Sequence, residues 1–135
     1  MAVLSNGWGT GLSAKQKQSQ AWVLDPQVVS TETVAAGNGS GNAVALSTTS
    51  TVSFVTTATN STHVSLADGI TGQVKIIVHK TRSNSEDLVI TPANFAAGST
   101  LTSDAASRSV TLLFDGTNWQ VIAGEITGTA EFVIA

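Results

Sequence analysis

Ser109-Val110-Thr111-Leu112-Leu113-Phe114 leads into Asp115-Gly116-Thr117-Asn118, and Trp119-Gln120-Val121-Ile122 follows at once. The apolar residues Val110, Leu112 and Phe114 alternate with other side chains on a period of two, which is typical of a strand with one buried face. Trp119 and Val121 continue the same alternation after an Asp-Gly turn. Two alternating segments joined by such a turn predict a β-hairpin.

The remainder of the chain repeats this pattern in short segments rich in Val and Thr. We expect further strands at 28–34, 43–46, 52–57, 62–66, 73–80, 88–90, 98–101 and 128–135. Short strands at turn spacings, with no helical period of useful length, indicate an all-β fold, an antiparallel β-sandwich or barrel. The jelly-roll, Greek-key and β-tulip-like arrangements all remain open at this point.

Segment 73–80 is the most apolar of the expected strands, and we expect it to be central. Val74, Ile76 and Val78 fall on one face and are predicted to point into the core. Ile77 lies on the other face, which predicts partial burial there as well.

Composition indicates a neutral surface. Charged residues make up 11% of the 135 residues, the net charge is -3 and the mean hydropathy is +0.20. Ordinary soluble domains carry about 25% charged residues, so copies of this chain repel one another weakly, which suits a protein docked to others. No basic stripe could neutralise a row of phosphates, which argues against nucleic acid as a partner.

Targeting signals are missing from the sequence. The chain has no cysteine, and the N-terminus lacks the basic and apolar regions of a signal peptide. No segment approaches the roughly 18 apolar residues of a membrane span. We therefore expect synthesis in the cytoplasm and no membrane association.

Catalytic patterns are also missing. His63 and His79 are the only histidines, and no Gly-x-Ser-x-Gly turn marks a nucleophile. Surface or interface positions are the better interpretation of both histidines. Glu86 and Asp87 are neighbours, whose side chains would diverge in a strand, so a solvated loop end is expected. The sequence predicts a non-enzymatic protein with no cofactor and no metal.

The two ends of the chain differ from the middle. Residues 1–25 have no apolar period, and Gly7, Gly9 and Gly11 surround Trp8, so we expect an extended N-terminal arm before a β domain at 26–135. An ordered arm would use its large apolar and basic side chains to attach to a partner, and the alternative is a disordered tail with an exposed Trp8. The expected attachment residues are Trp8, Lys15, Lys17 and Trp22.

The last expected strand is apolar and lies at the chain end. Phe132, Val133 and Ile134 need cover there, and a terminal strand leaves an unpaired edge unless a neighbour takes it. We therefore expect these three residues at an oligomer interface, in a homotrimer or another closed ring.

Segments 65–69, 72–78, 88–94, 109–114 and 118–119, in this order and spacing, resemble a repeated pattern in small virion proteins of tailed bacteriophages. The resemblance covers residues 50–124 and departs from the pattern at 81–85, where a glycine-rich loop is expected. It implies a capsid decoration (cement) protein that sits on the outer shell as a homotrimer, with the major capsid protein as partner. The protein would be made in the host cytoplasm and end on the virion surface. The alternatives are a receptor- or glycan-binding module of a phage tail fibre and, behind it, an enzyme or an unrelated adhesin.

Overall fold

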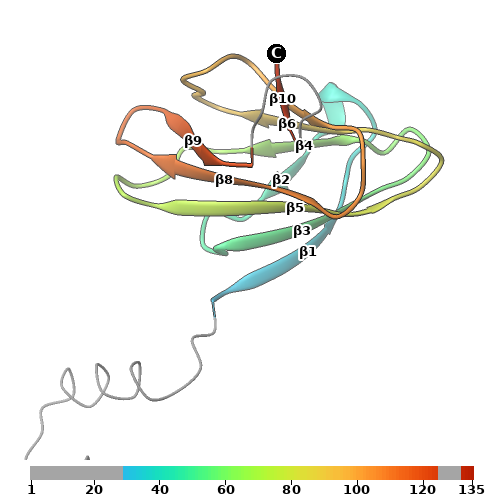
Figure 1. Cartoon of the computed structure of the whole chain (residues 1–135), viewed down its shortest axis with the longest axis horizontal. Coiled ribbons are helices and arrows are strands. Elements are labelled where there is room, and N and C mark those ends of the chain that lie inside the picture. Colours follow the sequence, from blue (N-terminus) through green and yellow to red (C-terminus); the bar gives the residue numbers. More distant parts are fainter. Residues whose placement is uncertain (1–28, 125–131) are drawn as a thin grey trace, which may run out of the picture.

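The computed structural model describes residues 29–124 and 132–135, which form two stacked five-stranded sheets (Figure 1). The first sheet has the order β1 (Thr31–Ala35), β3 (Val52–Thr57), β5 (Val74–Arg82), β8 (Arg108–Phe114) and β9 (Trp119–Ala123). The second has the order β10 (Val133–Ile134), β7 (Leu101–Ser103), β6 (Leu88–Pro92), β4 (His63–Leu66) and β2 (Val44–Leu46). A single 3₁₀ turn, η1 (Ser40–Asn42), precedes β2. The predicted all-β sandwich is confirmed, whereas the arm at 1–25 and its boundary lie outside the described residues.

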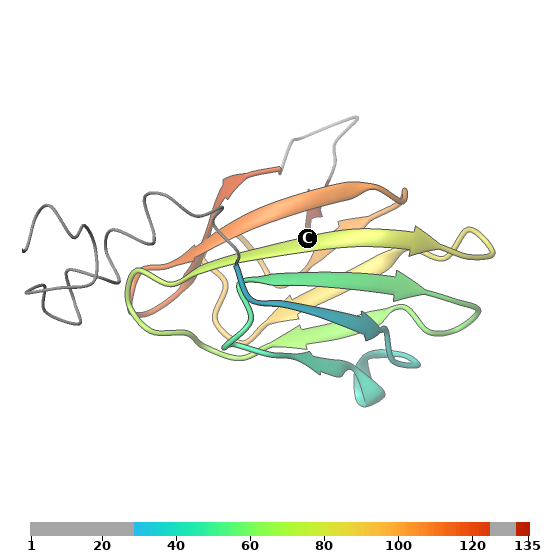
Figure 2. The ribbon, with the colours of Figure 1, turned by 90° about the horizontal axis from the view of Figure 1, so that it is seen from below.

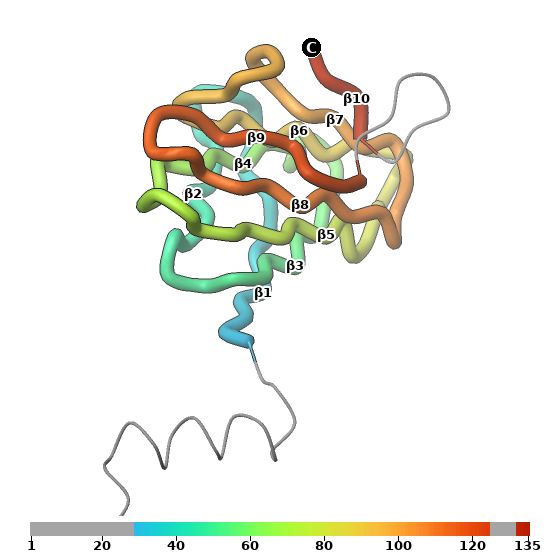
Figure 3. Tube along the Cα trace, turned by 60° about the vertical axis from the view of Figure 1, so that its left-hand side comes forward, coloured from blue at the N-terminus to red at the C-terminus, as the bar shows by residue number. Residues whose placement is uncertain are grey.

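The sheets are mixed, so the antiparallel part of the prediction is wrong. β1, β3 and β5 run parallel in the first sheet, as their arrowheads in Figure 2 show, and β2, β4 and β6 run parallel in the second. From β1 to β6 the chain changes sheet and direction after every strand, a passage between layers that Figure 3 shows. Each of the strands β1 to β4 therefore pairs with the strand two places later in the sequence, and the two run parallel. Only β6–β7, β5–β8, β8–β9 and β7–β10 are antiparallel pairs.

The hairpin that the sequence predicted is present as β8 and β9. Leu112 is opposite Val121, and Phe114 is opposite Trp119, with ring centroids 5.2 Å apart. Leu112 and Trp119 are fully buried. The Asp115 carboxylate accepts hydrogen bonds from the main-chain N–H groups of Thr117 and Asn118, each at 2.8 Å. These two bonds stabilise the turn between the two strands.

β5 is central to the first sheet, as predicted, but the opposite face is buried. Lys75, Ile77 and His79 point into the sandwich and are fully buried. The residues predicted to point inward are on the outer surface of the sheet: Val74, Ile76 and Val78. The assignment failed because it ranked the two faces by hydropathy, while Lys75 and His79 find enough hydrogen-bond partners inside to remain buried.

Candidate functional site

His79 is held at one end of β5 by hydrogen bonds to both ring nitrogens. Its Nε2 is 3.0 Å from the Thr57 hydroxyl on β3, and its Nδ1 is 3.1 Å from the Ser103 hydroxyl on β7. These hydroxyls also lie 3.0 Å from the carbonyl oxygens of Glu86 and Ala105, respectively. The ring thus links the two sheets, and the prediction of a surface or interface position for His79 is wrong.

Hydroxyl groups engage both ring nitrogens of this histidine. A neutral imidazole has one N–H donor and one acceptor nitrogen. One hydroxyl therefore accepts from the ring N–H and donates to its carbonyl neighbour, Glu86 for Thr57 or Ala105 for Ser103. The other hydroxyl donates to the bare ring nitrogen. Both nitrogens are therefore engaged, which leaves neither for a substrate or a metal.

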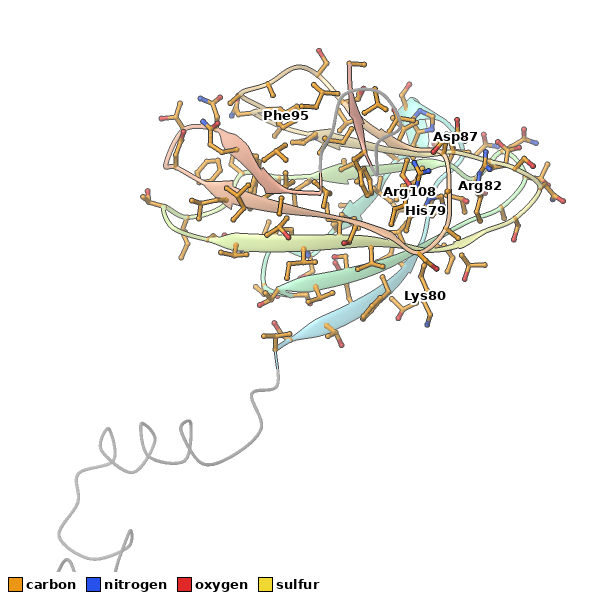
Figure 4. The ribbon with its side chains drawn as sticks, in the orientation of Figure 1. His79, Lys80, Arg82, Asp87, Phe95 and Arg108 are labelled. Carbon is orange, nitrogen blue, oxygen red and sulfur yellow. The ribbon has the colours of Figure 1, made fainter. Side chains whose placement is uncertain are left out.

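The surroundings of His79 disfavour its charged form. Burial lowers the pKa of His79, and the positive charge of Arg82 acts in the same direction. Figure 4 shows Arg82, Asp87 and Arg108 gathered around this end of the sandwich. The Asp87 carboxylate accepts from Arg82 at 2.6 Å and only partly opposes the lowering of the His79 pKa. The ring is a neutral structural link between the sheets.

Lys75 occupies the other end of β5 as a buried cation. Its ammonium donates to the carbonyl oxygens of Ser47 and Ser50, each at 2.7 Å, and contacts Glu32 Oε1 at 3.3 Å. Glu32 Oε1 also accepts from the Ser47 N–H at 2.9 Å and from the Ser53 hydroxyl. Three acceptors match the three protons of an ammonium. Burial lowers the pKa of Lys75, and the nearby Glu32 opposes that effect. Because its ammonium bonds to Glu32 on β1 and to two carbonyl oxygens of the loop, Lys75 holds the 47–51 loop against β1.

Two kinds of feature are absent from the described residues. Within 29–124 and 132–135, no group of three or more His, Cys, Asp or Glu side chains could hold a metal ion. The same residues include no helix long and apolar enough to cross a membrane.

The outer surface of the first sheet is apolar. We call it the outer apolar face, and it consists of Phe54, Val74, Ile76, Val78, Leu113 and Ile122. None of these side chains packs against the buried core cluster. Val74 is 38% exposed and Ile122 is 55% exposed. Exposed apolar surface of this kind marks contact sites when its members are contiguous. Strand pairing makes Phe54 and Val78 contiguous in one row.

The outer surface of the second sheet is smaller in its side chains and richer in hydroxyls. We call it the outer hydroxyl face, and it consists of Ala45, His63, Ser65, Val89, Thr91, Thr102 and Val133. The pairing places Ser65 beside Thr91 and Val89 beside Thr102. Neither outer face carries a charged side chain among the described residues, except for Lys80 at a margin, whose ammonium lies 5.7 Å from the centre of the Phe54 ring.

Apart from Lys80, the exposed charges of the described residues lie at the two ends of the sandwich. At the His79 end, Arg82 pairs with Asp87 at 2.6 Å and Arg108 pairs with Asp104 at 2.5 Å. At the opposite end, Asp68 and Asp115 lie on the loops after β4 and β8. A molecule with charged ends and uncharged faces can pack side by side with other subunits without separating like charges.

The predicted site residues have different outcomes. Trp8, Lys15, Lys17 and Trp22 lie outside the described residues. Phe132 is fully buried in the core of its own chain, so the prediction that it lies at an oligomer interface is wrong. Its cover comes from within, because β10 pairs with β7 and turns Phe132 inward. Ile134 packs partly against the same core, and Val133, 47% exposed, remains open to a neighbour.

Comparisons with models of protein families and with curated proteins find no match for this chain.

Proposed function

We propose that this protein is a non-enzymatic structural protein of a tailed-phage virion, a capsid decoration (cement) protein that binds the outer shell and stabilises it. The observation that carries the proposal is the distribution of charge, because between the charged ends the two outer faces carry one charge, Lys80 at a margin, among the described residues. A free monomer gains little from such faces, whereas a subunit packed among others covers them. The resemblance of residues 50–124 to phage virion proteins supports the same function.

The engagement of both buried polar groups of β5 supports a structural function over a catalytic one. Lys75 and His79 are the groups that burial could tune for chemistry. Each instead has every polar atom engaged by the protein itself. In this proposal the sandwich is a scaffold, and its binding partners are the major capsid protein and further copies of the chain, with a homotrimer as the proposed assembly.

Attachment to the shell is assigned in this proposal to the arm. Trp8 and Trp22 supply large apolar contacts with few rotatable bonds, and Lys15 and Lys17 can pair with carboxylates on an acidic shell. The β sandwich then faces outward or toward neighbouring copies.

The test is co-sedimentation of the purified full-length chain with capsids assembled without it. We expect saturable binding and a rise in the temperature at which the capsids open. Trp8→Ala should weaken binding, and the double variant Lys15→Ala with Lys17→Ala should make the remaining binding less dependent on salt. Lys80→Ala is the matched control, since it removes a surface charge of the sandwich and leaves the arm intact.

Two results would contradict the proposal. Labelled protein found at the tail, and not on capsid faces, would favour the receptor- or glycan-binding module of a tail fibre. Undiminished binding by a chain that lacks residues 1–25 would move attachment from the arm to the sandwich.

A further inference from the structure

The first sheet ends in an open strand edge at β1. Figures 1 and 2 show β1 at the margin of the sheet, and among the described residues no strand pairs with its outer side. The side chains of Thr31, Thr33 and Ala35 are exposed along it. An edge of this kind presents unpaired N–H and C=O groups, which are a template for another strand.

The pairing with β3 fixes which groups are unpaired. The Ser30 carbonyl accepts from Val52 N–H at 3.0 Å, and Ala36 N–H donates to the Thr56 carbonyl at 2.9 Å. Even-numbered residues therefore bond to β3, because alternate residues of a strand direct their main-chain groups to opposite sides. The residues that direct their N–H and C=O groups to the open side are Thr31, Thr33 and Ala35.

The other sheet margins are shorter or partly covered. At β9, Trp119 N–H donates to the Asn94 carbonyl at 2.9 Å and its carbonyl accepts from Ala96 N–H at 3.1 Å. β2 has three residues and β10 has two in the described part of the chain. β1 has five residues, an unbroken register with β3, and none of the Pro, Lys or bulges that blunt natural edges.

We propose that this edge binds β1 of a second copy of the chain, in an antiparallel ladder centred on Thr33. The strand is self-complementary in that register, with Thr33 opposite Thr33, Thr31 opposite Ala35 and Glu32 opposite Val34. Glu32 is its one charged residue, and its carboxylate is turned inward and held by Lys75. No like charges meet across the two-fold axis, which is the commonest symmetry of homo-oligomers.

The pairing also extends the outer apolar face. Thr33 lies beside Phe54, which lies beside Val78, so this row runs through the two-fold axis into the second copy. Two first sheets become one continuous sheet with a single broad surface, on which Lys80 is the charged residue that each copy contributes from its described part. The proposal goes beyond the shell-binding function and stands without it, since it concerns only contacts between copies of the free protein. A trimer formed through other surfaces leaves the edge available, so the pairing predicts an even number of copies.

A single introduced cysteine tests the register, because the chain has no cysteine of its own. In Thr33→Cys the two cysteines are directly opposite, with Cα atoms about 5.5 Å apart, which a disulfide can span. Thr31→Cys is the matched control on the same strand and face. Its two cysteines are separated by four residues along the ladder, about 13 Å, which a disulfide cannot span. Mild oxidation should convert most of the first variant, and little of the second, to covalent dimer.

A proline at the same position tests the main-chain bonds. Thr33→Pro removes an N–H that makes no bond to β3, so the sandwich keeps its own ladder. Thr33→Val keeps that N–H and is the control. In sedimentation of the folded full chains, checked by circular dichroism, Thr33→Pro should halve the mass of the native assembly and Thr33→Val should not. Equal masses for all three chains, or equal oxidation of the two cysteine variants, would overturn the proposal.

Discussion

The two ends of β5 bury a polar side chain in different ways. At one end Lys75 is a full charge, paired with Glu32 and bonded to two carbonyl oxygens of the 47–51 loop. At the other end His79 is a neutral ring between two hydroxyls, in a setting that lowers its pKa. The cation ties a loop to the first sheet, whereas the ring ties the first sheet to the second. The packing at one end of β5 therefore depends on a charged side chain, and the packing at the other end depends on an uncharged one.

Lys75→Ala should produce the largest loss of stability. It leaves Glu32 inside without its cation and leaves the carbonyl oxygens of Ser47 and Ser50 without their donor. Breaking a buried pair by removal of one partner costs about 3–5 kcal/mol. Urea unfolding of the full chain measures it, with Lys80→Ala as the exposed control, expected within about 0.5 kcal/mol of the native chain.

Lys75→Met separates the charge from the packing at the same end. The variant keeps the aliphatic stem and loses the ammonium. If it is as stable as the native chain, Lys75 contributes by filling space, and the assigned role of its hydrogen bonds is wrong.

Leu112→Ala should cost about 2–5 kcal/mol, depending on how far the site collapses. Leu112 is directly opposite Lys75 on β8 and is fully buried. It therefore gives an apolar reference for the charged end, measured in the same urea titration. A loss below about 1 kcal/mol would show that the core does not pack around β8 as described.

His79→Ala should cost less, about 1–3 kcal/mol, because the groups that lose the ring as a partner are neutral hydroxyls and not charges. Thr57 and Ser103 each retain a carbonyl acceptor at 3.0 Å. The surface or interface position that the sequence predicted for His79 implies little effect of this substitution on folding, and the buried position of His79 reverses that expectation. Thermal unfolding measures the loss, and an unchanged midpoint would restore the original expectation.

The sequence predicted which segments form strands better than it predicted how these strands pair and which of their faces is buried. The hairpin at Asp115 is local, so alternation and turn chemistry were sufficient. The buried face of β5 was not predictable from hydropathy, because Lys75 and His79 are inward only when the 47–51 loop and Ser103 supply partners distant in sequence. A strand that crosses to the opposite sheet and a strand that forms a hairpin leave the same local pattern, so the parallel pairs were not predictable. Phe132 was predicted at an oligomer interface and is buried in the core for the same reason, because the residues that bury it lie on strands distant in sequence.

Acid should weaken the His79 end selectively, and this is the smallest of the expected effects. The pKa of His79 in the folded chain lies below its ordinary value of 6.5, first because of burial and then because of Arg82. Between the two pKa values the unfolded chain binds more protons, so stability rises with pH in that window. The contribution of His79 is complete above about pH 6.5 and is lost as the pH falls through the folded pKa.

His79→Gln can still bond to Thr57 and Ser103 but cannot titrate, so its unfolding free energy should fall less between pH 7 and pH 5. His63→Gln is the matched control, because among the described residues that ring makes a single side-chain hydrogen bond, to the adjacent Thr62 hydroxyl. If the unfolding free energy of the native chain and of His79→Gln has the same pH dependence, protonation of His79 does not contribute to the loss of stability in acid.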